Sequence, residues 1–197
     1  MSGQSATGGG SDPTSAPAVA PPAPLPGWLG RGNRAALRQG LAVAAVVTAL
    51  DQAAKLWLLN VFHLTENHIV TLAPVLDLRL VRNYGISYGL FQQHGALGRG
   101  LLLLVNVVAV VLLAAWLMRA QSRLVVVALA LIIGGALGNS IDRVAYGAVI
   151  DFIAFHVVMP SFRFDWYVFN LADAAIVAGV AGLLYDSLYG HGAAKTP

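Results

Sequence analysis

The chain contains no cysteine among its 197 residues. It therefore has no disulfide framework, no thiolate zinc site and no cysteine nucleophile. Charged side chains are also scarce, at 11% of the residues, whereas soluble domains carry about 25%. Because 57% of the residues are hydrophobic, polar groups cannot cover the surface of the folded chain. The composition therefore predicts that lipid is the solvent.

Residues 1–30 lack both the apolar core and the basic leading segment of a secretory signal peptide. They consist mainly of Gly, Ser, Ala, Pro and Thr, which bury too little surface to offset the entropy of ordering. We expect a disordered cytoplasmic tail over residues 1–30, a membrane domain over 31–190 and a short cytoplasmic tail over 191–197. The twelve Lys and Arg form no run of five, so the net charge of +3 does not predict a nucleic-acid partner.

Four stretches are apolar over about 20 residues, the length that a helix needs to cross a bilayer. They run from about Leu37 to Val61, from Gly100 to Met118, from Leu124 to Ile141 and from near Phe169 to Tyr189. Three Arg precede the first span with no nearby acid, and such residues tend to stay in the cytoplasm. We therefore predict an all-α integral membrane protein with four transmembrane helices and both termini in the cytoplasm.

The segment between the first two spans is too long for a tight turn. Residues 75–80 alternate apolar with polar side chains, which is the period of a half-buried strand. Asn83-Tyr84-Gly85 is a turn signal, and Ile86 to Phe91 is expected to return as a second strand. We therefore predict a small extracytoplasmic β-sheet between helices 1 and 2, lying at the membrane surface.

Polar side chains are unevenly distributed over the spans and their edges. Ionisable groups in a bilayer are costly unless they are paired or face a cavity, so each one marks a functional site by default. With a cytoplasmic N-terminus, these residues all fall in the outer half of the membrane or at its outer edge: Asp51, Lys55, Asn139, Asp142, Arg143, Asp151, Asn170 and Asp173. The clustering predicts one site near the outer surface and not a path across the bilayer.

The spacing of some of these residues indicates contacts. Asp51 and Lys55 are four apart, so they share a helix face and can form an ion pair that lets the helix insert. Asn139 and Arg143 have the same spacing, and the planar fork of Arg143 suits a carboxylate or a backbone carbonyl. Taken alone, Asp151 and Asp173 each fit a helix cap or an ion pair better than a catalyst, because carboxylates suit helix N-termini.

Small residues at four-residue spacing favour close approach of the third and fourth helices. They are Gly134 and Gly138 in the third span, and Ala174, Ala178 and Gly182 in the fourth. That approach would bring the region of Asn139 beside Asn170 and Asp173.

Two other motifs are typical of functional sites. The sequence Gly85-Ile86-Ser87-Tyr88-Gly89 fits the pattern around a serine nucleophile, but that pattern requires the alternating strands and helices of an α/β sheet, which are missing here. His63 and His68 have a ligand-like spacing, but no second pair of ligands accompanies them, which argues against zinc.

Five blocks of residues, in order, carry a resemblance to the bacterial lipoprotein signal peptidase (signal peptidase II) family from about Leu37 to Tyr189. The blocks are Asp51 to Lys55, Asn83 to Gly89, Gly134 to Arg143, Gly147 to Phe152 and Phe169 to Asp173. The second block departs from the family pattern, with Ser87 and Tyr88 where Ala and Phe are usual. This departure bears on fine substrate or inhibitor contacts.

The resemblance implies a reaction, a site and a location. The family cleaves the signal peptide from prolipoproteins immediately before a Cys that carries diacylglycerol. Its catalytic pair matches Asp151 and Asp173. Its other motif residues, for site support or substrate binding, match Asp51, Lys55, Asn83, Gly85, Asn139, Asp142, Arg143 and Asn170.

The implied partners are diacylglyceryl-modified prolipoproteins and membrane lipid, with no cofactor and no metal ion. The implied location is the bacterial inner membrane, with the active site near the extracytoplasmic surface. The oligomeric state stays open, with a monomer favoured.

The chemistry of two neighbouring carboxylates is consistent with this implication. They cannot both ionise easily, so one keeps a proton. The ionised group can deprotonate water while the protonated one polarises the scissile carbonyl. One rival hypothesis is a small transporter or proton carrier, which predicts polar groups at successive depths in the membrane. The inner halves of the spans contain almost no polar groups, which argues against it. Another, a non-enzymatic assembly factor, predicts that Asp-to-Asn changes are tolerated.

Overall fold

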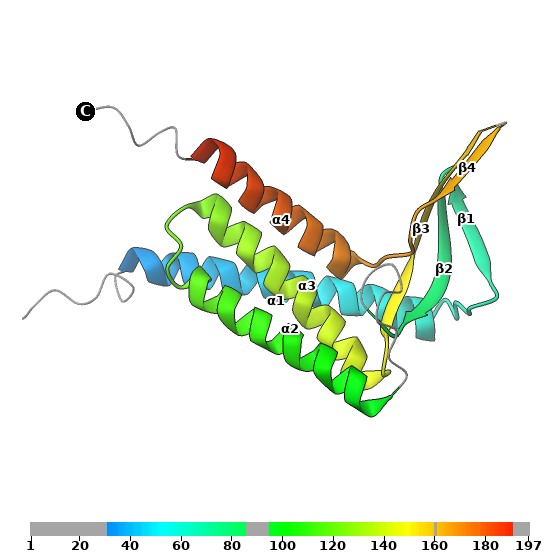
Figure 1. The fold of residues 1–197 in the computed structure, drawn as a ribbon, viewed down its shortest axis with the longest axis horizontal. Coiled ribbons are helices and arrows are strands. Elements are labelled where there is room, and N and C mark those ends of the chain that lie inside the picture. Colours follow the sequence, from blue (N-terminus) through cyan, green and yellow to red (C-terminus); the bar gives the residue numbers. More distant parts are fainter. Residues whose placement is uncertain (1–30, 86–94, 160, 191–197) are drawn as a thin grey trace, which may run out of the picture.

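A computed structural model of the chain describes residues 31–85, 95–159 and 161–190. These residues form the helices α1 (Arg31–Asn60), α2 (Ala96–Leu117), α3 (Arg123–Ala145) and α4 (Leu171–Tyr189). They also form the strands β1 (Ile69–Ala73), β2 (Leu76–Asn83), β3 (Val149–Met159) and β4 (Phe162–Asp165). The helices form a bundle, and the sheet projects from one end of it (Figure 1). The predicted tails, 1–30 and 191–197, lie outside the described residues.

All four helices are long and apolar enough to cross a membrane, over Arg34–Asn60, Leu97–Leu117, Arg123–Ala145 and Leu171–Tyr189. Large apolar side chains lie on the outside of the bundle; Leu101 and Leu112 of α2, for example, are more than half exposed. Such a surface is stable in lipid and not in water. The prediction of four transmembrane helices with a small sheet is therefore confirmed.

Helix α3 lies at the centre of the bundle and contacts each of the other three helices. Its glycines allow these contacts. A Cβ atom at Gly134 would lie 2.7 Å from the carbonyl oxygen of Ala44 in α1, and one at Gly135 would clash with the carbonyl of Ala172 in α4. On the facing helix, a Cβ at Gly179 would lie 2.5 Å from the carbonyl oxygen of Ala128. Small residues therefore bring the backbones of neighbouring helices together.

The prediction that small residues bring α3 and α4 close together is confirmed, but part of the set of residues predicted to make the contact is wrong. Gly134 faces α1 and not α4, and Thr48 of α1 donates to its carbonyl oxygen at 2.9 Å. The tightest contacts between α3 and α4 are made by Gly135 and Gly179, which the four-residue spacing did not select. Gly182 does face α3, because a Cβ there would meet Ala128 at 3.1 Å. Spacing alone does not tell which of several neighbours a helix face meets.

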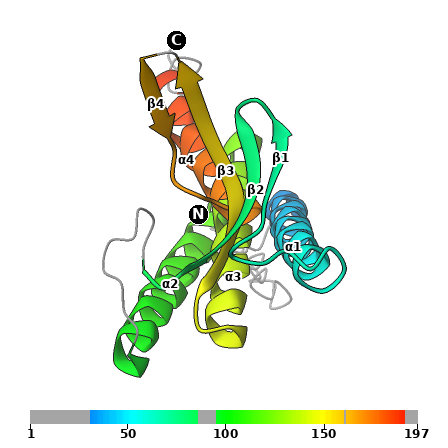
Figure 2. The same ribbon diagram turned by 90° about the vertical axis from the view of Figure 1, so that its right-hand side faces the viewer.

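The sheet is antiparallel with strand order β1-β2-β3-β4 (Figure 2). The alternating segment at 75–80 forms most of β2, which confirms that strand, and its partners are β1 and β3. The predicted return strand at 86–91 lies outside the described residues. The sheet is not confined to the connection between α1 and α2, because β3 and β4 come from the connection between α3 and α4. Residues 149–153 of β3 form a largely apolar run, which does not reveal its partner strand.

The chain enters and leaves this sheet at two defined points. Gly147 has a φ of +76°, a conformation that favours glycine, and it turns the chain from the end of α3 into β3. Asn170 caps α4 where the chain returns to the bundle. As a result, Asp151 lies near the start of β3, and Asp173 lies in the first turn of α4.

Candidate active site

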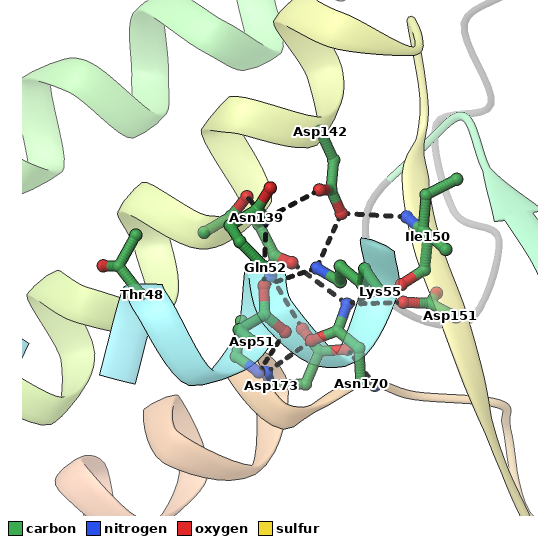
Figure 3. Close-up of polar contacts among 12 residues, drawn as sticks. Thr48, Asp51, Gln52, Lys55, Asn139, Asp142, Ile150, Asp151, Asn170 and Asp173 are labelled. Carbon is green, nitrogen blue, oxygen red and sulfur yellow. Dashed lines mark hydrogen bonds and ion pairs between the residues drawn. The ribbon is translucent and has the colours of Figure 1, made fainter. Parts of the chain in front are cut away.

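Most of the predicted site residues meet where the sheet-side parts of α1, α3 and α4 approach the start of β3 (Figure 3). Most of them are buried. Asp51, Asp142 and Asn170 are 0% exposed, and Lys55, Asp151 and Asn139 expose between 1% and 8% of their surface. Polar groups this deeply buried need partners, and the described atoms of the site supply them.

Asp151 is held by two asparagines from different elements. Its Oδ1 accepts a hydrogen bond from Asn170 Nδ2 at 2.7 Å, and its Oδ2 accepts one from Asn83 Nδ2 at 3.1 Å. Asn83 ends β2 and Asn170 precedes α4, so the carboxylate is fixed from both sides. Asn83 Oδ1 in turn accepts from the backbone N–H of Gly85 at 3.0 Å, which confirms a turn at that point.

Asp173 is joined to Asp151 through two asparagine side chains. Asp173 Oδ1 accepts from Asn139 Nδ2 at 2.9 Å, and Asn139 Oδ1 accepts from Asn170 Nδ2 at 3.0 Å. Asn170 Nδ2 also reaches Asp151, so one amide connects both sides of the pair. The structure thus brings Asn139 beside Asn170 and Asp173, as the close approach of α3 and α4 predicts.

Asp173 also takes part in the cap of its helix. Asn170 Oδ1 accepts from the backbone N–H of Asp173 at 2.9 Å, and Asp173 Oδ2 accepts from the backbone N–H of Asn170 at 3.2 Å. This reciprocal pair is a capping box. Capping and a chemical role do not exclude each other here, because Asp173 also lines a polar cavity of about 150 Å³ with Asn83, Asn106, Asn139 and Arg143.

Lys55 lies between two buried carboxylates. Its Nζ is 2.6 Å from Asp51 Oδ2 and 2.6 Å from Asp142 Oδ2. Gln52 Nε2 adds hydrogen bonds to Asp142 Oδ1 at 2.9 Å and to Asp51 Oδ2 at 3.2 Å. The predicted Asp51–Lys55 pair is confirmed, and the structure extends it to α3.

These two carboxylates also hold the backbone next to each candidate catalytic residue. Asp51 Oδ1 accepts from the N–H of Ala172, which precedes Asp173, at 3.0 Å. Asp142 Oδ2 accepts from the N–H of Ile150, which precedes Asp151, also at 3.0 Å. Because Lys55 bridges the two carboxylates, it ties the backbone position of Asp151 to that of Asp173.

Arg143 binds backbone carbonyls in the structure. Its Nη1 donates to the carbonyl oxygen of Asn139 at 3.3 Å, and its Nη2 donates to the carbonyl oxygen of Gly85 at 3.1 Å. Of the two partners that its planar fork suits, the described contacts show carbonyls. Arg143 therefore connects α3 to the turn after β2, at the edge of the polar cavity.

Asp151 lies outside the membrane-spanning helices, and the pKa of its carboxyl group is raised. Burial raises the pKa of Asp151 to about 7, and the negative charge of Asp173 acts in the same direction. Hydrogen bonds from Asn83 and Asn170 and the charge of Lys55 oppose this rise. Near neutral pH the carboxyl can therefore take up or release a proton, as a general acid or base must.

The sequence pattern did not predict a site role for two residues of this region. Gln52 belongs to the block from Asp51 to Lys55, and its amide reaches two carboxylates and the carbonyl oxygen of Gly138 at 3.1 Å. Asn106 lies in the second span, which contains no ionisable residue from Gly100 to Met118, and it lines the polar cavity. An amide inside an otherwise apolar run was the signal for Asn106. In the part of the chain that the structure describes, no three His, Asp or Glu side chains are arranged to hold a metal ion. The position of Ser87 lies outside the described residues.

Comparison with known proteins identifies the family. The family model described as Signal peptidase (SPase) II matches residues 43–189 of this chain. The chain belongs to the signal peptidase II family. Similar proteins include the lipoprotein signal peptidases of Nitrobacter hamburgensis, 53% identical over 161 residues, and Methylorubrum extorquens, 56% identical over 153 residues. These alignments cover 82% and 78% of this chain, and 98% and 87% of the two relatives.

Solved structures agree with this assignment at the level of the fold. Two structures described as bacterial membrane enzymes superpose with TM-scores of 0.68 and 0.64, at 23% and 25% sequence identity. They cover 81% and 77% of this chain, which in turn covers 93% of each. Together, the family model, the relatives and the four apolar helices identify the chain as a multi-pass protease of a bacterial membrane. The transporter hypothesis gains no support from any of these similarities.

Proposed function

We propose that this signal peptidase II removes the signal peptide from prolipoproteins by hydrolysing the bond before a diacylglyceryl-modified Cys, with Asp151 and Asp173 as its catalytic pair. One observation supports the pair above all others. Asn139 and Asn170 join the two carboxyl groups, which come from β3 and α4, and Asp173 opens onto a polar cavity. The pair shares one proton, so that one carboxyl is ionised and the other is neutral.

In this mechanism the ionised carboxylate takes a proton from water, and the water oxygen attacks the carbonyl carbon of the scissile bond. The protonated carboxyl donates a hydrogen bond to the carbonyl oxygen, which carries the developing negative charge. When the tetrahedral intermediate collapses, the C–N bond breaks and the leaving amine of the Cys takes up a proton from the pair. The signal peptide leaves with a new carboxylate, and the lipoprotein keeps its lipidated Cys as the N-terminal residue.

We place the site at the extracytoplasmic surface and both termini in the cytoplasm. Helix α1 begins and α4 ends at the end of the bundle away from the sheet (Figure 1). The turn between α2 and α3 lies at the same end. That end carries Arg34, Arg38, Arg119 and Arg123, which the positive-inside rule assigns to the cytoplasm. At the opposite end, neighbouring rings of Phe164, Trp166, Tyr167 and Phe169 lie within 5.4–6.0 Å of one another, as suits a membrane interface.

An apolar hollow beside Asp173 supports the requirement for a lipidated substrate. It has a volume of about 560 Å³ and extends from Asp173 along α4, past Val177, Ala178 and Ala181, with Trp166, Tyr167 and Phe169 around it. An acyl chain in such a hollow contributes roughly 0.8 kcal/mol for each buried CH₂. The lipid would therefore hold the cleavage point at the level of the catalytic pair.

We expect a precursor without diacylglycerol to be cut roughly a hundredfold more slowly than the lipidated precursor, because poor alignment at the reacting atoms carries a rate cost of this order. The measurement compares purified protein on the same precursor with and without the lipid, in matched lipid or detergent. Equal rates on the two precursors would rule out the lipid as a positioning device. Absence of cleavage on both would overturn the proposed function itself.

The raised pKa of Asp151 predicts the pH dependence of cleavage. If the pair acts with one proton, kcat/KM should fall as the pH rises above about 7, because the pKa of Asp151 is about 7 and the pair then loses its last proton. Changing Asn83→Ala removes a hydrogen bond that stabilises the charged form. This raises the pKa of Asp151 further, so the alkaline limb of the pH profile should move to higher pH. A limb that stays in place or moves to lower pH in Asn83→Ala contradicts this assignment.

A further inference from the structure

Asn106 is an amide in the apolar helix α2 that contacts α3 on one side. Its Nδ2 donates to the carbonyl oxygen of Ala136 at 2.8 Å and also donates to Ser140 Oγ. The Ser140 hydroxyl donates to the same Ala136 oxygen at 2.8 Å. A polar side chain in a bilayer needs such partners, and the simplest explanation of these hydrogen bonds is that they join α2 to α3.

Because the amide nitrogen of Asn106 makes both contacts with α3, its oxygen Oδ1 takes part in neither of them. The Ala136 oxygen can only accept, so the nitrogen of Asn106 must face it, and both amide hydrogens are used by Ala136 and Ser140. No donor among the described residues reaches Asn106 Oδ1. Asn106 also lines the polar cavity that contains Asp173, Asn139 and Arg143. The oxygen is therefore an acceptor with no protein donor in the described part of the chain.

The other two asparagines of this cavity are occupied at both ends of the amide. Asn139 donates to Asp173 and accepts from Asn170. Asn83 donates to Asp151 and accepts from the backbone N–H of Gly85. Among the cavity amides that the structure describes, Asn106 alone offers a carbonyl oxygen that is not already bound.

A peptide that enters this cavity has backbone N–H groups that require hydrogen-bond acceptors. A signal peptide must be locally unwound before water can attack its backbone, and unwinding releases N–H groups in surroundings with little water. A backbone N–H without an acceptor at membrane depth is costly. We propose that Asn106 is a substrate-binding residue whose Oδ1 accepts a hydrogen bond from a backbone N–H of the unwound signal peptide. This inference rests on the proposed function, since it requires a peptide in the cavity.

The test is a double-mutant cycle between Asn106 and the substrate backbone. Diacylglyceryl-modified precursors are made with one amide replaced by an ester, in turn at each of the few positions on the signal-peptide side of the scissile bond. Affinity is measured as the apparent KM for cleavage and as the Kd for full-length protein carrying Asp151→Asn. For wild-type Asn106, one ester position should weaken binding about tenfold, equivalent to about 1.4 kcal/mol. In Asn106→Leu, the all-amide precursor should bind about tenfold more weakly, and the same ester should cause no further loss.

Controls separate this role from a contact between helices. Ser140→Ala removes one partner of the Asn106 amide but leaves its oxygen in place, so the ester effect should remain as in wild type. If Asn106→Leu does not fold, Asn106→Ser withdraws the oxygen with a smaller change. Independent losses from the variant and the ester at every position, or no ester effect in wild type, would overturn the inference. The Kd measurement needs no turnover, so it tests Asn106 even if the wild-type protein fails to cleave.

Discussion

Asp151→Asn and Asp173→Asn are each expected to abolish cleavage of a diacylglyceryl-modified precursor while the protein still inserts and accumulates. The mechanism needs one carboxyl to give a proton and the other to take one, and an amide does neither. The loss of general acid–base catalysis is expected to reduce the rate by about 10²–10⁴-fold. Each Asn keeps the size of the Asp and one acceptor oxygen, so the structure should survive. Asp151 loses one of the two bonds to Asn83 and Asn170, and Asp173 loses one of the two to Asn139 and Asn170.

A matched control lies on the same helix as Asp173. Asp186 is near the other end of α4, where its Oδ1 accepts from Ser122 Oγ at 3.2 Å. Asp186→Asn makes the same chemical change far from the cavity and should retain the wild-type rate. Rates are compared for equal amounts of folded protein, judged by size-exclusion profile and thermal unfolding. Near-normal turnover in folded Asp151→Asn or Asp173→Asn would contradict the aspartyl mechanism and favour a non-enzymatic use of these residues.

Lys55→Ala is expected to lower the yield of folded protein several-fold and to impair cleavage by the protein that does fold. The Lys55 side chain is 1% exposed, and its ammonium group lies between the carboxylates of two side chains that are 0% exposed. Removing one partner from a buried ion pair costs about 3–5 kcal/mol, because the remaining charge is left without compensation. Here two negative charges remain and repel each other. They also hold the N–H groups of Ala172 and Ile150, so their separation should displace the candidate catalytic pair.

An exposed ion pair supplies the control for Lys55. Arg82 and Glu66 are 3.1 Å apart with side chains 41% and 58% exposed, and such pairs contribute about 0–1 kcal/mol. Arg82→Ala should therefore leave the folded yield near the wild-type level. The double change of Asp51→Asn with Lys55→Gln should recover part of the yield, because Asp142 is then the only charge in the cluster. A yield of Lys55→Ala equal to that of Arg82→Ala would refute the structural role. A double variant that recovers no yield, while its folded fraction is inert, would indicate a direct functional role for the pair.

The sequence predicts those parts of the structure that depend on local pattern. The four spans follow from the length of the apolar runs, the contact of Asp51 with Lys55 follows from their four-residue spacing, and β2 follows from alternation at 75–80. These features need no knowledge of which elements become neighbours. The role of Asp173 as a helix cap is equally local, because Asn170 lies three residues before it.

Contacts between distant elements could not be predicted in the same way. Nothing in the spacing of Lys55 and Asp142 shows that α1 and α3 place them 2.6 Å apart. The pairing of β2 with β3 joins two connections of the chain, and the apolar start of β3 gives no register. The depth of the residues in the bilayer does predict that they gather at one end of the bundle. Their individual hydrogen bonds depend on how the backbones approach one another at Gly135 and Gly179.

The most direct measurement of the central claim is the mass of both products when purified protein cleaves a diacylglyceryl-modified precursor in a single turnover in ¹⁸O-labelled water. The account predicts a lipoprotein that begins at the lipidated Cys and a signal peptide with one ¹⁸O atom in its new C-terminal carboxylate. It also predicts that Asp186→Asn gives the same products and that Asp151→Asn and Asp173→Asn leave the precursor intact. An uncut precursor with wild-type protein, a cut at another bond, or the same products from either catalytic variant would contradict it.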